Sequence, residues 1–86
     1  MSTDLTLPTV HLNGTSRKML TEGYQNAYRK LIEFRDAFSR IEHNARDYYV
    51  QGPDAWRKAC HQRDVQRQRI ADLMTYLEAH LLELGE

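Results

Sequence analysis

Two short segments of the sequence combine residue types that bind phosphate groups or nucleobases. The first contains an Asn-Gly turn, two hydroxyl residues and a basic residue at the expected start of a helix. Free N–H groups and the positive end of the helix dipole attract anions at such a start. The spacing is not that of a P-loop. The candidate ligand-binding residues of this segment are His11, Asn13, Gly14, Thr15, Ser16 and Arg17.

The competing interpretation of this first segment is an ordinary helix start. The Asn13-Gly14 pair is typical of a turn, because both residues tolerate positive φ. Thr15 or Ser16 would then accept hydrogen bonds from the first backbone N–H groups of the helix. In that case the polar side chains cap the helix and hold no ligand.

The second segment lies between the two expected helices and contains Arg46, Tyr48, Tyr49 and Gln51. The planar guanidinium of arginine suits phosphate or a base edge, and tyrosine rings can stack on a base. These four residues are candidate ligand-binding residues as well. The alternative is structural: the tyrosines cap the end of a helix pair, and Arg46 forms a local surface pair with Asp47.

Apolar residues from Leu20 to Ala45 recur at spacings that alternate between four and three residues. This spacing predicts a helix over residues 17–43 that packs against another helix. A second helix is predicted over residues 53–84, with Pro53 at its first position. We therefore predict an all-α protein, an antiparallel helical hairpin that turns near Tyr49.

The predicted register of the hairpin places Arg63 and Arg67 opposite Leu31 and Phe34. Arginines on a packing seam are costly unless they are paired or solvated. Either their stems lie over Phe34 with the charged heads in water, or they line a polar site or a subunit contact.

The first fifteen residues are predicted to form an extended N-terminal arm, and residues 16–86 the helical hairpin domain. Apolar and polar residues alternate over residues 5–12, and Pro8 removes one backbone donor, which favours an edge or arm. Such an arm can lie along the helices and bury Val10 and Leu12. The alternative is a disordered tail.

Charge and size limit the classes of function. The 86 residues suffice for one domain, and twelve basic and twelve acidic side chains balance, which argues against a protein that only coats DNA. Residues 57–69 hold five basic and one acidic side chain, whereas residues 70–86 hold four acidic and no basic ones. No apolar stretch approaches the ~20 residues that cross a bilayer, so we expect a soluble intracellular protein without membrane contact.

A single hairpin of this size leaves much of its apolar stripe uncovered, so a homodimer or larger bundle is expected. The two polar segments would lie at opposite ends of one hairpin, about 40 Å apart by helix rise. They converge only if the arm folds back or if subunits pack antiparallel.

The sequence gives little indication of a metal site, a cofactor site or a catalytic site. Cys60, His61 and Asp64 are near neighbours without a familiar ligand spacing. Cys60 and His61 diverge by about 100° on a helix, which is unsuitable for a nucleophile and its base. The lone Cys60 also excludes a disulfide within the chain. We expect a protein that is not an enzyme and needs no metal or cofactor.

The blocks Leu-Pro-Thr-Val-His-Leu-Asn-Gly-Thr-Ser (7–16) and Asn-Ala-Arg-Asp-Tyr-Tyr-Val-Gln-Gly (44–52) resemble those of a family of small uncharacterised proteins encoded by bacteriophages and prophages. The resemblance implies a phage origin and a helical fold, and it implies no activity. With the intracellular location expected above, a phage origin would place the protein in the host cytoplasm. Small phage proteins of this size often inhibit bacterial defence, which is an argument by analogy.

The expected function is therefore non-enzymatic binding and sequestration of a phosphate-bearing small molecule, such as a cyclic-nucleotide signal of anti-phage defence. The alternative is a protein-interaction module that inhibits a host protein. A third possibility is nucleic-acid binding through the basic residues 57–69.

Overall fold

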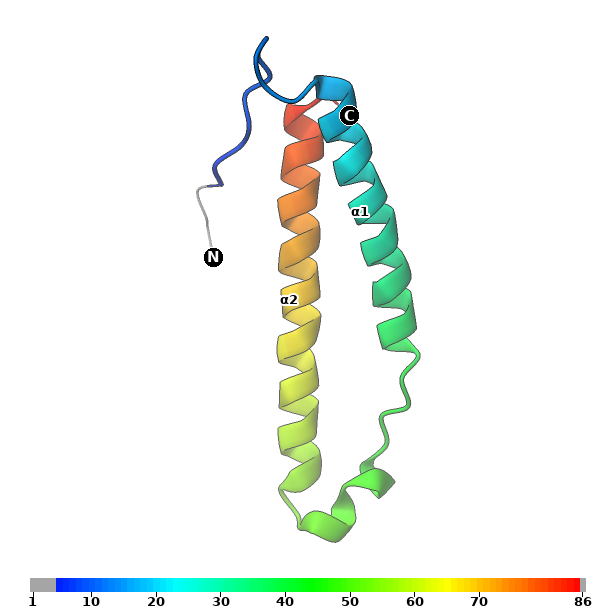
Figure 1. The fold of residues 1–86 in the computed structure, drawn as a ribbon. Helices are drawn as coiled ribbons and strands as arrows, with labels where there is room; N and C mark the ends of the chain where they lie inside the picture. The colour runs from blue at the N-terminus through cyan, green and yellow to red at the C-terminus, as the bar shows by residue number, and fades with distance from the viewer. Residues whose placement is uncertain (1–4, 86) are drawn as a thin grey trace.

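Two long helices fold back on one another in the computed structural model, which describes residues 5–85 (Figure 1). Helix α1 spans Arg17–Ser39 and helix α2 spans Ala55–Glu83. Two single-turn 3-10 helices, η1 (Ala45–Asp47) and η2 (Tyr49–Gln51), lie in the connection. The described residues contain no strand. The prediction of an all-α antiparallel hairpin is confirmed.

Both helices are shorter than predicted at the connection. Helix α1 ends at Ser39 instead of His43, because Arg63 of α2 donates to the carbonyl oxygens of Phe38 and Ile41, at 3.1 Å and 3.2 Å. Helix α2 begins at Ala55 instead of Pro53. The residue before Pro53 is Gly52, whose φ of 122° is outside the helical region, so the chain turns before α2 can start.

The register of the hairpin differs from the predicted one by about one turn of α1. Arg63 lies opposite Phe38, with its guanidinium carbon 5.1 Å from the ring centroid, and not opposite Leu31 and Phe34. Arg63 is half-buried and caps the C-terminal end of α1. Neither interpretation offered for this arginine describes that role. Arg67 is exposed.

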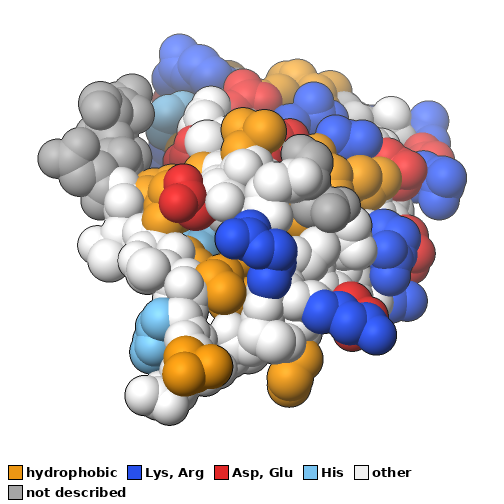
Figure 2. Space-filling view, turned by 90° about the horizontal axis from the view of Figure 1, so that it is seen from above, with side chains coloured by type: hydrophobic (Ala, Val, Ile, Leu, Met, Phe, Trp, Pro, Cys, Tyr) orange, Lys and Arg blue, Asp and Glu red, His pale blue; other side chains and the backbone are white. Residues whose placement is uncertain are grey.

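The buried core is small and lies near the C-terminal end of α2. The described residues with buried side chains are Leu77, His80 and Leu84. The radius of gyration is 18.3 Å, against roughly 12 Å for a compact chain of this length. Figure 2, which views this end from above, shows apolar side chains at the surface between charged ones. The molecule is a rod with little interior.

The segment before α1 has no regular secondary structure. Val10 is half-buried, but Leu12 is 98% exposed, so the predicted burial of Leu12 is wrong. The reason is a turn over residues 11–14, closed by the Gly14 N–H donating to the His11 carbonyl oxygen at 3.1 Å, which places Leu12 at its tip. Residues 1–4 of the predicted arm lie outside the described residues. Among the described helices, none has the length and apolar character needed to cross a membrane.

Candidate ligand-binding site

The first polar segment is largely engaged in contacts within the chain. The Ser16 hydroxyl accepts a hydrogen bond from the Met19 N–H at 3.1 Å and caps α1. The Arg17 guanidinium donates to the Leu84 carbonyl oxygen at 2.8 Å, which joins the start of α1 to the end of α2. Asn13 and Thr15 are exposed. These contacts favour the interpretation as a capped helix start.

Gly14 has a packing role that the sequence did not indicate. Its φ is not positive, so the expected conformational freedom is not used there. A Cβ atom at this position would lie 2.8 Å from Nε2 of His11. The His11 ring therefore lies against the backbone of Gly14, and both residues shape the turn.

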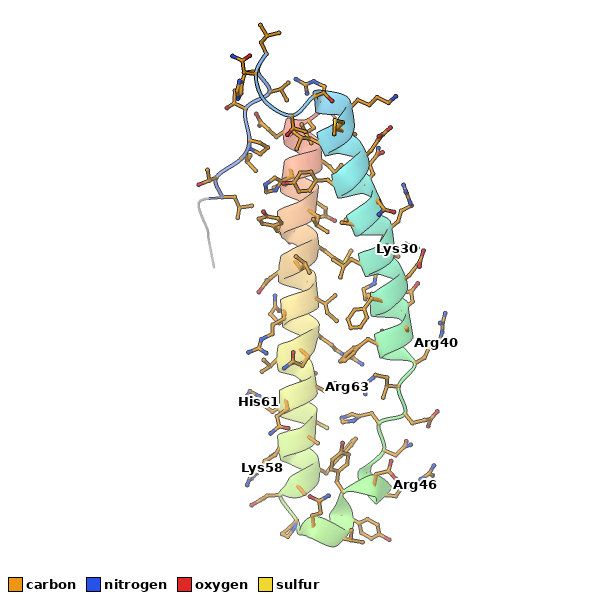
Figure 3. The ribbon with its side chains drawn as sticks, viewed as in Figure 1. Lys30, Arg40, Arg46, Lys58, His61 and Arg63 are labelled. Atoms are coloured by element: carbon orange, nitrogen blue, oxygen red, sulfur yellow. The ribbon has the colours of Figure 1, made fainter. Side chains whose placement is uncertain are left out.

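The second polar segment divides between the interior and the surface. Tyr48 packs with His43 and Trp56, with ring centroids 5.9 Å and 5.8 Å away. Tyr49 is 68% exposed. Arg46 points away from α2, on the opposite side from Lys58 and His61 (Figure 3). Tyr48 thus has the predicted structural role, and the four candidates of this segment do not converge on one point.

A hollow of about 460 Å³ lies beside this segment at the start of α2. Six of the residues that line it are Tyr48, Gln51, Gly52, Asp54, Lys58 and Gln62. A neighbouring hollow of about 370 Å³ shares Lys58 and Gln62 and adds Arg57 and His61. Volumes of this size are typical of small-molecule sites.

The electrostatics of the hollow favour an anion. Asp54 is paired with Arg57, whose Nη2 lies 2.8 Å from the carboxylate, so the local negative charge is balanced. The Lys58 ammonium adds a positive charge on the hollow's wall. The N-terminal turn of α2 adds the positive end of the helix dipole. A phosphate group here would meet a net positive environment.

Lys58 and Gln62 were not among the candidates from the sequence. They lie one turn apart on α2, and with Ala55 they follow the helical spacing of one face. This helical spacing, followed from the Gly52-Pro53 turn into the predicted second helix, is the sequence pattern that could have identified Lys58 and Gln62. Among residues 5–85, no group of three His, Cys, Asp or Glu side chains is arranged to hold a metal ion.

The two polar segments lie at opposite ends of the hairpin (Figure 1). Helix α1 alone separates them by about 35 Å along its axis. Within one chain they do not form a composite site.

No known protein family matches the sequence, and no solved structure matches the fold. A part of the probable inorganic carbon transporter subunit DabA of Bacillus licheniformis is 39% identical to this chain over 64 residues. The match covers 73% of this chain but 7% of the length of that protein.

Proposed function

We propose that the chain is a non-enzymatic binding protein for a phosphate-bearing small molecule, and that the hollow at the start of α2 is its site. The observation that carries the proposal is the meeting of an aromatic ring, amide side chains and a positive charge around about 460 Å³. Of the sequence candidates, Tyr48 and Gln51 line this hollow, and Lys58 and Gln62 join them.

The roles follow from the chemistry of each group. Lys58 and the first N–H groups of α2 would bind the phosphate. Tyr48 offers a ring for stacking on a base, and the amides of Gln51 and Gln62 can each donate to and accept from a base edge. A cyclic nucleotide carries both features, so it is the ligand class that we propose. Sequestration of a defence signal by a phage protein would need no chemical step.

Self-association is part of this proposal. The described chain buries two apolar side chains, Leu77 and Leu84. Two buried apolar side chains are a small core for an isolated domain, and a domain with a small core usually needs a disulfide, a metal or oligomerisation for stability. The lone Cys60 is free, so a disulfide within the chain does not supply that support. We propose a homodimer or a larger bundle, with the N-terminal arm contributing to its surface.

The test is calorimetry of the full chain with a panel of cyclic di- and trinucleotides. We expect one class to bind, and Lys58→Gln to weaken it about tenfold, which corresponds to about 1.4 kcal/mol. The matched control is Lys30→Gln: Lys30 lies on α1, where it pairs with Glu33 at 3.8 Å. Its change should leave affinity within about twofold. A folded protein that binds no member of the panel would refute the proposal.

A second candidate function, a protein-interaction module, is favoured by two exposed neighbours at the tip of the connection. Tyr49 is 68% exposed and Val50 80%, and adjacent exposed apolar side chains are typical of protein contacts. Binding to a purified host partner that Val50→Ser abolishes and Lys58→Gln leaves intact would favour this function over the first.

A further inference from the structure

An apolar groove runs between the two helices on one face of the hairpin. Its floor and walls include Leu31, Phe34, Ile70 and Leu73, and it encloses about 290 Å³. Phe34 is 54% exposed and Leu73 48%, although both lie within the regular part of their helices. The described part of the chain covers these side chains only in part, since Leu31 and Ile70 are half-buried, so the groove is an incomplete packing surface.

The exposed area of the chain shows how much cover is needed. The chain exposes 6843 Å², whereas a compact monomer of 10.2 kDa would expose about 5,300 Å². The excess of roughly 1,500 Å² exceeds the ~800 Å² that each partner buries in a standard protein interface. The excess exposed area is therefore large enough for an interface of standard size with one further copy of the chain.

The charge along α2 indicates how a second copy would be oriented. Residues 57–69 are basic and residues 70–86 are acidic, as the sequence shows. Lys58 and Arg69 belong to the first group and Glu83 to the second. Parallel α2 helices would place like charges side by side, which is destabilising. Antiparallel α2 helices would place each basic half beside an acidic half and would also oppose the two helix dipoles.

We propose that the groove is occupied by a second copy of the same chain, packed with the two α2 helices antiparallel about a two-fold axis near Leu73. The proposal rests on the self-association proposed above and adds its face and its direction. The pair would be an antiparallel four-helix bundle. It would also bring the hollow at the start of α2 of one copy near the α1 start of the other, so that the two polar segments meet between copies.

Cross-linking of cysteine variants tests the orientation. In a background with Cys60→Ser, one variant carries Gln62→Cys and the other Glu83→Cys. About Leu73, residue 62 of one copy lies almost level with residue 83 of the other, whereas two copies of residue 62 lie about 30 Å apart. A short bis-maleimide should link the mixed variants and should link neither variant to itself. Links of 62 to 62 and 83 to 83 would overturn the antiparallel arrangement.

Light scattering without any ligand tests the groove itself. The wild-type chain should show at least twice its mass, and Leu73→Glu should reduce the mass to one copy. Leu82→Glu is the matched control, because Leu82 is exposed on the same helix and does not line the groove. A single-copy mass for the wild type would overturn the groove proposal. Because these measurements contain no nucleotide, they are independent of the calorimetric result.

Discussion

The two ends of the hairpin differ in how fully they satisfy their own polar and apolar groups. At the closed end, where α1 starts and α2 ends, Arg17 donates to Leu84 and Ser16 caps α1. His80 is 1% exposed and stacks on Tyr24 with ring centroids 4.6 Å apart. Its Nδ1 lies 2.8 Å from the Tyr76 carbonyl oxygen and must donate the proton, because a carbonyl oxygen can only accept.

The loop end satisfies its groups less completely. In the connection between α1 and α2, the regular structure is limited to the single 3-10 turns η1 and η2. The Nε2 atom of His43 is buried there without a hydrogen-bond partner among the described residues. Asp54 stands at the N-cap position of α2 but makes no capping hydrogen bond with its side chain. The hollow of about 460 Å³ described above lies beside Tyr48 and Asp54.

The two ends therefore have different roles: the closed end contributes most to stability, and the loop end is the one available for binding. At the closed end, polar groups form hydrogen bonds with one another, which stabilises this end and leaves few donors and acceptors for a ligand. Groups at the loop end remain available because the chain there has fewer internal partners. The closed end should therefore be sensitive to core substitutions, and the loop end to substitutions that change its charge.

The largest expected effect is at the closed end. Leu77 is one of the two buried apolar side chains, so Leu77→Ala should lower the free energy of unfolding by about 2–4 kcal/mol. Leu82→Ala removes the same atoms from an exposed site and should stay within about 0.5 kcal/mol. Urea denaturation at fixed protein concentration measures both. Equal effects would mean that the closed end is not the core.

Substitution of one glycine at each end tests how strongly the two turns depend on glycine. Gly52 has φ 122° and ψ 167°, a region essentially restricted to glycine, so Gly52→Ala should cost about 1–3 kcal/mol. Gly14 is limited by the exposed His11 ring, which can turn away, so Gly14→Ala should cost less than about 1 kcal/mol. Denaturation of the two variants gives the order, and a reversed order would contradict this account of the turns.

Arg63 tests how the end of α1 is held at the loop end. Its guanidinium donates to the carbonyl oxygen of Phe38, in the last turn of α1, and to that of Ile41, two residues beyond the end of the helix. Arg63→Ala leaves them to solvent and should cost about 1–2 kcal/mol. Arg67→Ala is the control, because Arg67 is exposed one turn further along α2. Loss of helicity at the end of α1, seen by amide exchange, should accompany the first change and not the second.

The pattern of the sequence predicted the two helices because burial along a helix is periodic. It could not predict where α1 ends, since that depends on Arg63, which is distant in sequence. The one-turn error in register has the same origin. His80 was missed as a core residue because a lone histidine carries no pattern, and its partners Tyr24 and Tyr76 meet it only in the folded chain.

The candidate site was predicted in part for a similar reason. Tyr48 and Gln51 were found because they stand in a conspicuous polar loop, whereas Lys58 and Gln62 stand within a helix of mixed charge. The contribution of Ser16 and Arg17 to the closed end depends on Leu84, at the other end of the sequence. Residue types indicated what each segment could bind, and only tertiary contacts show which groups remain available.

The smallest expected effect is the alkaline response of the contact between Tyr28 and Glu78. The Tyr28 hydroxyl donates to the Glu78 carboxylate at 2.6 Å, and this hydrogen bond raises the pKa of Tyr28 above its ordinary value of 10.0. A group with a raised folded pKa adds stability that is complete below its unfolded pKa and is lost as pH rises through the folded value. Stability should therefore fall above about pH 10.

Tyr28→Phe should reduce this alkaline loss, and Glu78→Gln should reduce it by a similar amount because it removes the acceptor's charge. Burial raises the pKa of Tyr24 at the closed end as well, so part of the loss should persist in both variants. Urea denaturation across the alkaline range measures the slope. If the Tyr28→Phe and Glu78→Gln profiles both matched that of the wild type, the hydrogen bond between the helices would contribute nothing, and the closed end would be held by its core and by Arg17 alone.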